Sequence, residues 1–251
     1  MEEVKPVDLS VIIPCRNEAK RIWGTLAALD SWRQAVNPHY LEVLLTIEPS
    51  RDNTTLVATS AAIQFPHLGI NVIETHEAKG KGNAVRVGLE HACAEIVMFM
   101  DADGSVPMEM IGPLIYPIQT GTADITIGNR KLADSMILEH QPTLRENAGV
   151  LFNLIMRAQG FISTKDSQCG FKAFSSSSLK IYNNYLTRFK SDGFGFDVEL
   201  LYRAKLAGLR IKDVPVAWKN HPSTSVTRKT GAYAFIEPTI WCWRERLSRP
   251  I

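Results

Sequence analysis

The strongest constraint on the fold is a regular alternation of short apolar runs and helix-like segments in the first hundred residues. The apolar runs cover residues 9–13, 42–47, 70–75 and 95–100. Between them, helical periodicity or helix-start signals cover 18–36, 52–64 and the stretch from Gly80 onward. Strands that are apolar throughout and alternate with helices are typical of a parallel sheet covered on both faces. The sequence therefore predicts an α/β fold with a mostly parallel sheet.

The pattern is looser after residue 105, but the same two kinds of segment continue. Strands are predicted at 123–128, 170–174 and 209–218, and helices at 143–160 and 194–207. Pro215 indicates that the last strand lies at a sheet edge, because proline cannot donate a ladder hydrogen bond. The serine run 175–178 is typical of a helix start. No linker or internal repeat divides the 251 residues, so we expect one domain.

Composition excludes several classes of protein. The net charge of +2 gives no bulk field for nucleic acid. The four cysteines form no CxxC pair, so we expect no zinc site and reduced core thiols in an intracellular protein. The polar start is unlike a signal peptide, and no run reaches the ~18 apolar residues of a membrane span. The aromatic and basic stretch 231–247 either lies on a membrane surface or docks on the core.

Two aspartates, Asp101 and Asp103, end the apolar run 95–100. Ligands of open α/β sheets bind beyond the carboxyl ends of the strands. Residues i and i+2 of an extended segment point the same way, so the two carboxylates would repel one another. A Mg²⁺ or Mn²⁺ ion would relieve the repulsion, because hard cations prefer oxygen ligands. The alternative is structural: Asp103 and Gly104 form a turn, and Asp101 caps a neighbouring segment.

Polar turns follow the three preceding apolar runs as well. They read PCRNE (14–18), IEPSRDNT (47–54) and KGKGNA (79–84). We expect these turns to face one crevice, because they follow successive strands. Gly80 and Gly82 allow close backbone approach, and Lys81 with the following helix start favours a diphosphate. Taken alone, this last turn is equally compatible with a plain strand-to-helix connection.

Eight motifs in order resemble a known family: VIIPCRNE, IEPSRDNTT, KGKGNAVRVGL, MFMDADGSVP, IGNRK, DSQCGFKAF, FGFDVELL and VPVAW. From about residue 9 to 220, the chain is similar to family 2 glycosyltransferases of the GT-A fold. The greatest similarity is to dolichyl-phosphate (polyprenyl-phosphate) mannosyl- and glucosyltransferases. The resemblance implies one Rossmann-like domain over 1–251. Within it, 1–105 would bind the nucleotide, 106–230 the acceptor, and 231–251 a membrane surface.

The resemblance also implies a donor site that uses Mn²⁺ or Mg²⁺. Its residues would be Pro14, Arg16, Asn17 and Glu18 at the base and ribose, Glu48 at the base, Lys81 and Gly82 near the ribose or diphosphate, Asp101 and Ala102 near the ribose or sugar, and Asp103 on the metal. The segment 218–229 resembles a loop that closes over the diphosphate, with His221, Arg228 and Lys229 as candidates. Ser105 stands where mannosyltransferase relatives often have a glutamine metal ligand.

Glu48 bears on the choice of donor. Guanine can offer two N–H groups to one carboxylate, whereas uracil offers a single imide N–H. This difference slightly favours GDP-mannose over UDP-glucose.

The acceptor implied by the resemblance is the phosphate of dolichyl or polyprenyl phosphate. A phosphate oxygen is already anionic, so the enzyme needs to position it rather than deprotonate it. Direct displacement would invert the anomeric centre and give a β-linked product from an α-linked donor. Arg130 and Arg145 are the candidates for the acceptor phosphate. The other catalytic candidates are Asp166 and Gln168, near the sugar or acceptor, and Asp197, which would orient an arginine or lysine.

Two other functions are compatible with these residues. One keeps the site but uses a small soluble acceptor. The other is a non-catalytic nucleotide-sugar-binding protein, which two departures from the family pattern, Ile47 and Ser105, would support. For the lipid-phosphate function we expect a cytoplasmic protein, peripheral on the cytoplasmic membrane face.

Overall fold

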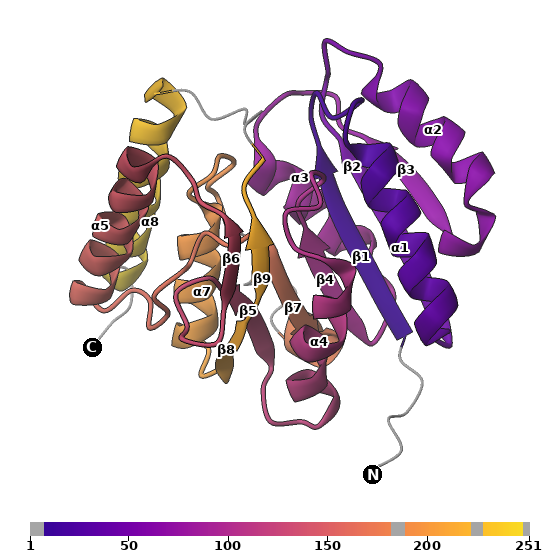
Figure 1. Ribbon diagram of the computed structural model, residues 1–251. Coiled ribbons are helices and arrows are strands. Elements are labelled where there is room, and N and C mark those ends of the chain that lie inside the picture. The colour runs from indigo at the N-terminus through magenta and orange to yellow at the C-terminus, as the bar shows by residue number, and fades with distance from the viewer. Residues whose placement is uncertain (1–7, 182–188, 222–227, 248–251) are drawn as a thin grey trace.

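The computed structural model describes residues 8–181, 189–221 and 228–247. Within these ranges the chain forms a seven-stranded sheet and a two-stranded sheet (Figure 1). In spatial order, the large sheet consists of β3 (Ile70–Glu74), β2 (Tyr40–Ile47), β1 (Asp8–Cys15), β4 (Ile96–Met100), β7 (Phe171–Ser175), β5 (Ile125–Asn129) and β8 (Ile211–Pro215). The small sheet pairs β6 (Met136–Glu139) with β9 (Ala217–Lys219).

Helices connect the strands and cover the large sheet. They are α1 (Ile22–Val36), α2 (Thr54–Gln64), α3 (Lys81–His91), α4 (Ile111–Gln119), α5 (Thr143–Ala158), α6 (Ser176–Ile181), α7 (Phe196–Leu206) and α8 (Arg228–Leu247). Short 3₁₀ helices cover Pro66–Leu68 and Met108–Met110. The alternation predicted for the first hundred residues is therefore confirmed, and so is the α/β fold.

The sheet is mostly parallel, as predicted. Strands β1 to β4 run parallel, β5 is parallel to β8, and only β7 among these strands is antiparallel to its neighbours. β1 lies between β2 and β4, so the strand order reverses direction at β1. Such a switch point leaves a crevice at the carboxyl ends of the strands. The loops that follow β1, β2, β3 and β4 lie at this end of the sheet.

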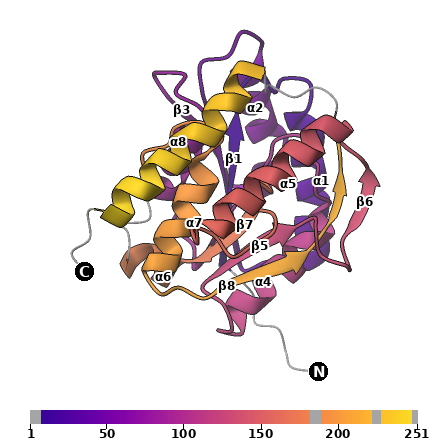
Figure 2. The ribbon, with the colours of Figure 1, turned by 90° about the vertical axis from the view of Figure 1, so that its left-hand side faces the viewer.

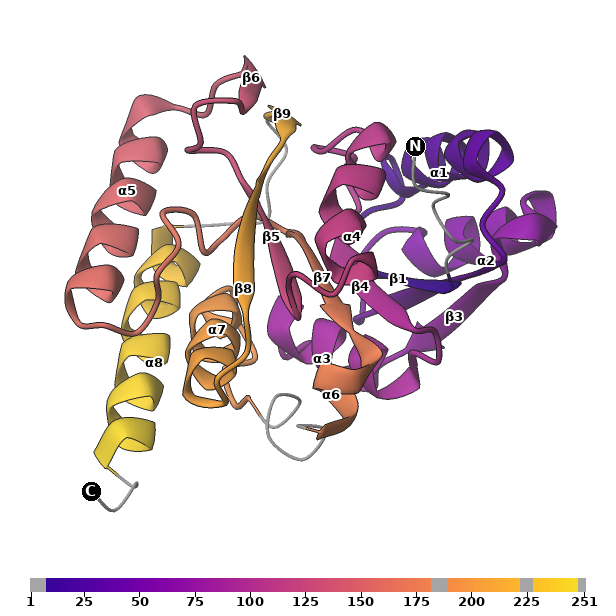
Figure 3. The same ribbon diagram turned by 90° about the horizontal axis from the view of Figure 1, so that it is seen from below.

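The large sheet separates two hydrophobic layers (Figure 3). Helices α1, α2 and α4 pack on one face, and α3 and α7 pack on the other. Alternate residues of β1 belong to the two layers: Val11 and Ile13 to the first, and Ile12 to the second. All three side chains are fully buried, which explains why this strand is apolar throughout.

Helices α5 and α8 lie side by side beyond the β8 edge of the sheet (Figures 1 and 2). Cys242 of α8 is fully buried, and the Trp243 indole N–H donates to Gln159 Oε1 at 2.7 Å. One face of α8 is therefore docked on the protein, which is one of the two arrangements predicted for 231–247. None of the described helices is long and apolar enough to cross a bilayer.

Several expectations for the later part of the chain need correction. The single strand predicted at 209–218 is wrong: it is two strands, β8 and β9, because the chain leaves the large sheet at Val216 to pair with β6. Pro215 does end the edge strand, as its missing N–H predicts. Helix α4 is absent from the prediction because Pro117 lies inside it. Cys93 is exposed rather than a core thiol, unlike the other three cysteines.

Candidate active site

The turns after β1 and β2 are joined by hydrogen bonds at the carboxyl end of the sheet. The Asn17 N–H donates to Ser50 Oγ at 3.0 Å, and Asn17 Oδ1 accepts the Arg51 N–H at 2.7 Å. Asn17 has φ of 57°, a left-handed conformation in which asparagine is enriched. The Glu18 N–H donates to Thr54 Oγ1 at 2.8 Å. The structure therefore brings these turns together as predicted, and it adds Ser50 and Thr54 to their scaffold.

Glu48, directly after β2, ties the turn after β3 to the first two turns. Its side chain is 2% exposed, and Oε1 accepts the Gly80 N–H at 2.6 Å. Oε2 lies 3.9 Å from Arg16 Nη1. Gly80 has φ of 131°, and a Cβ there would lie 2.5 Å from the carbonyl oxygen of Asp192. Glycine is required at this position both for its backbone conformation and for the close approach.

The loop before α7 packs directly on the start of α3. A Cβ on Gly82 would lie 2.3 Å from the Ser191 carbonyl oxygen. The Asn83 N–H donates to the Asp192 carbonyl at 3.3 Å, and Arg86 pairs with the Asp192 carboxylate at 2.5 Å. The close backbone approach predicted for this turn is therefore made to the protein itself. Sequence reasoning missed Ser191 and Asp192, which carry no motif of their own.

Asp101, directly after β4, is paired with a lysine. Lys81 Nζ lies 2.5 Å from Asp101 Oδ1. Burial is the largest single influence and lowers the pKa of Lys81, but Asp101 and Asp197 together outweigh it, so the pKa is raised overall. A Cβ on Gly170 would lie 2.1 Å from Asp101 Oδ2, so this glycine makes room for the carboxylate. Neither contact is the cap that the sequence allowed for Asp101.

Asp103 forms the turn that the sequence allowed. Its Oδ1 accepts the Ser105 N–H at 2.9 Å, and Gly104 has φ of 66°. Within the described ranges, no cluster of three or more histidine, cysteine, aspartate or glutamate side chains could hold a metal ion. A Mg²⁺ or Mn²⁺ ion would therefore combine the second oxygen of Asp103 with oxygens of a phosphorylated ligand. Mg²⁺ is commonly bound in this way at nucleotide sites.

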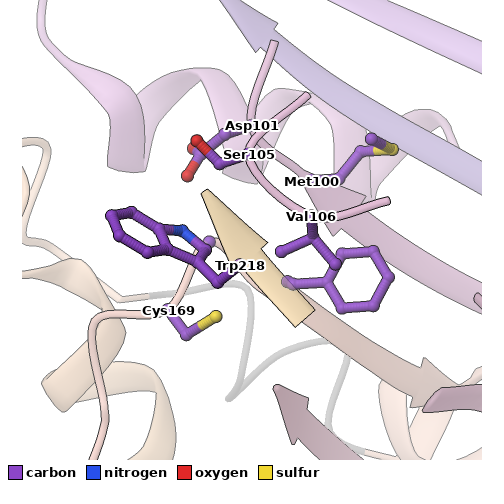
Figure 4. Close-up of a pocket in the computed structure, with 8 residues that line it drawn as sticks. Met100, Asp101, Ser105, Val106, Cys169 and Trp218 are labelled. Carbon is purple, nitrogen blue, oxygen red and sulfur yellow. The ribbon is translucent and has the colours of Figure 1, made fainter. Parts of the chain in front are cut away.

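A pocket lies beside these acids, at the ends of β4, β7 and β9. Its lining residues are Met100, Asp101, Ser105, Val106, Cys169, Gly170, Phe171 and Trp218. Figure 4 shows Asp101 and Ser105 on one side of the Trp218 indole and Cys169 on the other. The Lys219 N–H donates to the Ser105 carbonyl at 2.8 Å, which fixes β9 against the turn of Asp103.

Arg130, directly after β5, is bound by Asp166. Arg130 Nε and Nη2 donate to the two carboxylate oxygens, each at 2.7 Å, and its backbone N–H donates at 3.0 Å. Burial raises the pKa of Asp166, but Arg130 lowers it more, so the pKa is below its usual value. The guanidinium lies 5.1 Å from the centre of the Trp218 ring. Asp166 is buried, and it orients Arg130 rather than presenting its carboxylate to a ligand.

Arg145, in the first turn of α5, is exposed. It lies within electrostatic reach of Asp101 and Asp103 in the turn after β4. Burial of the guanidinium lowers its pKa and Arg130 lowers it further, whereas Asp101 and Asp103 oppose the shift. The two predicted acceptor arginines therefore influence one another and the two aspartates.

Asp197 and Glu199 point in different directions, as the helical period predicts. Asp197 Oδ1 lies 2.5 Å from Nζ of Lys172, a fully buried lysine of β7. Glu199 accepts from the Ser191 N–H at 2.9 Å and from Arg203 Nε at 3.0 Å. Asp197 thus orients a lysine, as expected, but its carboxylate is buried. Sequence reasoning missed Lys172; its signal is a single charge within an apolar strand.

Glu18 shares the electrostatic field of the two aspartates. Its carboxylate accepts from Arg21 Nε and Nη2, both at 2.6 Å. Burial raises the pKa of Glu18 to about 7, because it outweighs Arg21, and Asp103 and Asp101 add to the increase. The assignment of Glu18 to the base and ribose end stays a prediction.

The remaining predicted residues have fewer contacts. Pro14 is half-buried in β1, and the buried Ala102 accepts a hydrogen bond from Thr25 Oγ1 at 2.8 Å. Gln168 is half-buried and faces α5, with Oε1 4.0 Å from where a Cβ on Gly149 would lie. His221 is half-buried after β9. Arg228 and Lys229 begin α8, but their side chains lie outside the described part of the structure.

Comparison with known proteins decides the family. The model of "Glycosyl transferase family 2" matches residues 10–182. The chain belongs to glycosyltransferase family 2. This glycosyltransferase is 30% identical over 218 residues to dolichyl-phosphate beta-glucosyltransferase ALG5C of Trichomonas vaginalis, with 82% of this chain and 62% of that protein covered. It is 28% identical over 231 residues to dolichyl-phosphate beta-glucosyltransferase of Saccharomyces cerevisiae, with 86% and 68% covered. The glycosyltransferase thus spans about two thirds of the length of these relatives.

Among solved structures, the glycosyltransferase resembles glucosyl-3-phosphoglycerate synthase from Mycobacterium tuberculosis in complex with Mn²⁺, UDP-glucose and phosphoglyceric acid. The TM-score is 0.69 at 17% identity, with 94% of this chain and 80% of that chain covered. A likeness at this identity shows the fold alone. The predicted GT-A fold and the family resemblance are both confirmed.

Proposed function

We propose that this glycosyltransferase moves glucose from UDP-glucose to the phosphate of a polyprenyl phosphate, with inversion at the anomeric carbon. The observation that carries the proposal is the set of charges around the turn of Asp101 and Asp103. Lys81 follows β3 on one side of β4, and Arg130 follows β5 on the other. Lys81 therefore lies on one side of this turn, which we call the donor side. Arg130 and Arg145 define the other side, which we call the acceptor side. The relatives' names, dolichyl-phosphate glucosyltransferases, support a lipid-phosphate acceptor.

The donor base is inferred from Glu48. The preference for GDP-mannose required both carboxylate oxygens to be available to guanine. In the structure, Oε1 already accepts the Gly80 N–H, and Oε2 lies near Arg16. A single available oxygen matches the one imide N–H of uracil. Together with the glucosyltransferase names of the relatives, this geometry supports UDP-glucose in place of GDP-mannose.

Asp103 would hold the divalent ion through the oxygen that does not accept the Ser105 N–H. When bound, Mn²⁺ or Mg²⁺ supplies Lewis-acid neutralisation of the departing diphosphate. Lys81, fixed by Asp101, adds a second positive charge on the same side. Ser105 replaces the glutamine expected of mannosyltransferases, which also supports a glucosyl donor.

On the acceptor side, Arg145 would bind the phosphate. Arg130 keeps Nη1 outside its pairing with Asp166, so it can still donate to the same phosphate. The anionic phosphate oxygen then attacks the anomeric carbon from the face opposite the diphosphate, without a strong general base. Direct displacement of an α-linked nucleotide gives a β-linked glucosyl phosphate.

The lipid chain of the acceptor needs an apolar surface near Arg145, and helices α5 and α8 provide one. This α5/α8 surface consists of the exposed side chains Leu144, Val150, Leu151, Leu154, Ile155, Ile236, Ile240, Trp243 and Leu247. The spacing of its members on α8 is that of a single helix face. Arg244 and Arg246 follow in the last turn of α8. Because exposed apolar side chains beside arginines are typical of helices at anionic bilayers, we propose that this surface contacts the membrane.

The proposed activity can be tested by transfer of radiolabelled sugar. The purified chain is incubated with labelled UDP-glucose or GDP-mannose, polyprenyl phosphate in vesicles, and Mn²⁺, and lipid-linked label is extracted into organic solvent. We expect label from UDP-glucose, and none after chelation of the metal. Asp103→Asn should lower the rate by at least about 100-fold. Glu109→Gln, an exposed acid that follows the same turn, is the matched control and should retain activity.

Three outcomes would contradict the proposal in different ways. Absence of extractable label with both donors would exclude the lipid acceptor. Transfer of the sugar to a water-soluble phosphorylated acceptor would instead assign the alternative function, which uses a small soluble acceptor. Lipid-linked mannose without glucose would restore GDP-mannose as the donor. Metal-dependent UDP binding without any turnover would indicate a non-catalytic binding protein.

A further inference from the structure

Lys172 is a fully buried lysine in the centre of the large sheet. Its exposed fraction is 0%, although a charged side chain is expensive to bury. Nζ donates to Asp197 Oδ1 at 2.5 Å and to the Cys169 carbonyl at 2.7 Å, and it lies 5.2 Å from the centre of the Phe99 ring. Buried ion pairs often stabilise a fold no better than apolar residues of the same volume. The pair therefore calls for an explanation other than stability, and its two acceptors both lead to the donor site.

The first acceptor is the carbonyl of Cys169. The next residue, Gly170, packs directly against the Asp101 carboxylate. A Cβ on Gly170 would meet Asp101 Oδ2 at 2.1 Å, so a small displacement of this backbone moves the carboxylate. β7 pairs with β4 so that Phe171 is opposite Met100 and Lys172 is opposite Phe99. Lys172 thus holds the start of β7 at the level where β4 ends and the Asp101 turn begins.

The second acceptor, Asp197, lies within electrostatic reach of Lys81. Asp197 is buried, and its pKa is raised by burial, with Lys172 and then Lys81 opposing the shift. Lys81 in turn feels both Asp101 and Asp197. Four charges therefore alternate in sign from the sheet centre to the donor site: Lys172, Asp197, Lys81 and Asp101. The two terminal pairs are direct contacts at 2.5 Å.

We infer that Lys172 is a positioning residue for the donor site, which acts by holding the Cys169 carbonyl and Asp197 and so fixes the Asp101 carboxylate and the Lys81 ammonium. The inference rests on the proposed function for the identity of the donor. Lys172 itself touches no ligand. Its sequence signal, a single charge within an apolar strand, is also compatible with a lysine on a strand's solvent face; the antiparallel insertion of β7 between β4 and β5 buries it.

The decisive variant removes both charges of the buried pair. Lys172→Met alone leaves an unpaired buried aspartate and is expected to destabilise the fold. In Lys172→Met/Asp197→Asn no uncompensated charge remains, so the melting temperature should return close to that of the wild type. If Lys172 positions the donor site, the donor KM and the calorimetric Kd for UDP with Mn²⁺ should stay raised by about 30-fold despite the recovered stability. The acceptor KM should be unchanged.

The matched control is an ion pair at the opposite end of the sheet. Asp124→Asn/Arg210→Met removes a carboxylate and a guanidinium that bind each other just before the starts of β5 and β8. We expect this double variant to leave the donor KM and the UDP Kd within about twofold of the wild type. A raised UDP Kd in both double variants would show that Lys172 has only a general structural role.

The inference is overturned if Lys172→Met/Asp197→Asn binds UDP as tightly as the wild type. If that double variant does not fold, Asp197→Asn supplies the test at a temperature where it is folded, because its amide oxygen can still accept from Lys172 although the lysine loses its counter-ion. An unchanged donor KM there also overturns the inference. Failure of the proposed function has a different signature, since the wild type itself would then bind no UDP or transfer no label to lipid. If the wild type uses GDP-mannose, the same comparison is made with GDP.

Discussion

The proposed donor and acceptor sides of the site hold their functional groups in contrasting ways. On the donor side, the acids already have partners: Glu48 binds the Gly80 N–H, Glu18 binds Arg21, and Asp101 binds Lys81. On the acceptor side, Asp166 binds Arg130 in the same way, but Arg145 is exposed and the α5/α8 surface leaves large apolar side chains exposed to solvent. With the proposed ligands, the first side would suit a compact ligand of fixed shape, and the second a ligand that brings its own apolar environment.

The difference follows from what each side would have to recognise. A nucleotide offers many hydrogen-bonding groups in fixed positions, so partners held in place before binding avoid the cost of ordering them later. A prenyl chain offers only apolar area, which an exposed helix face can match without fixed partners. Apolar side chains that gather on an exposed surface mark an interaction site more often than they serve stability. Each prediction below perturbs one side and leaves the other as its control.

The largest effect is expected from Gly170→Ala on the donor side. The new Cβ would lie 2.1 Å from Asp101 Oδ2, and the partly exposed carboxylate would move away rather than the backbone. Moving Asp101 also breaks its bond with Lys81. We expect kcat/KM for the donor to fall by about 100-fold with little change in melting temperature, measured by label transfer and calorimetry. Gly112→Ala, whose Cβ would have no atom within 4 Å, is the control. Unchanged donor kinetics in Gly170→Ala would show that the position of Asp101 is unimportant.

A smaller effect is expected from Arg145→Ala on the acceptor side. If Arg145 binds the acceptor phosphate as proposed, loss of its guanidinium should raise the acceptor KM by about 10- to 30-fold and leave the UDP Kd unchanged. Arg157→Ala, at the other end of α5 and also exposed, removes the same charge away from the turn of Asp103. Equal increases in the two variants would indicate a general attraction of α5 to anions in place of a phosphate site.

Leu154→Glu tests the α5/α8 surface itself. A charge within an apolar face should weaken binding to anionic vesicles by about tenfold, as measured by flotation, because the carboxylate resists burial and is repelled by the lipid headgroups. Ile63→Glu on α2 is the matched control: Ile63 is 79% exposed, but it lies on the donor side. Turnover with a short, water-soluble prenyl phosphate should be unaffected in both. If Ile63→Glu weakens vesicle binding as much as Leu154→Glu does, the contrast between the two sides is lost.

The donor side is also the part that the sequence describes better. Its strands and polar turns are local patterns, and parallel strands in order bring their ends together by geometry alone. The opposite directions of Asp197 and Glu199 follow from the helical period in the same way. The slight preference for GDP-mannose did not take into account that the Gly80 N–H, from another turn, would donate to one oxygen of Glu48.

What the sequence leaves out depends on pairing between distant segments. Lys172 is buried only because β7 is inserted antiparallel between β4 and β5. The split of 209–218 depends in the same way on β6, whose exposed side chains carry no strong strand signal. The role of Gly170 cannot be inferred from the sequence for the same reason, because its missing Cβ matters only once the fold places Asp101 against it. None of these pairings has a local pattern from which it could be inferred.

The smallest effect concerns the pH dependence that Glu18 gives to the donor side. Burial raises the pKa of Glu18 from 4.5 to about 7. Because the folded pKa exceeds the ordinary value, the folded state holds the proton more tightly than the unfolded chain. The stability contributed by protonated Glu18 is complete below pH 4.5 and is lost as the pH rises to about 7. The full shift would correspond to roughly 3 kcal/mol, and because Glu18 is only partly buried and solvent screens its carboxylate, we expect a loss of about 1 kcal/mol.

Urea unfolding between pH 5 and pH 8 measures this loss. Because the glutamine side chain does not titrate, Glu18→Gln should show a flatter pH dependence of the free energy of unfolding than the wild type. Glu109→Gln, an exposed acid outside the pair of Glu18 and Arg21, should keep the wild-type slope. Identical slopes in all three proteins would mean that the Arg21 pairing keeps Glu18 ionised. The donor side would then hold its acids without a cost in stability near neutral pH, and its contrast with the acceptor side would rest on geometry alone.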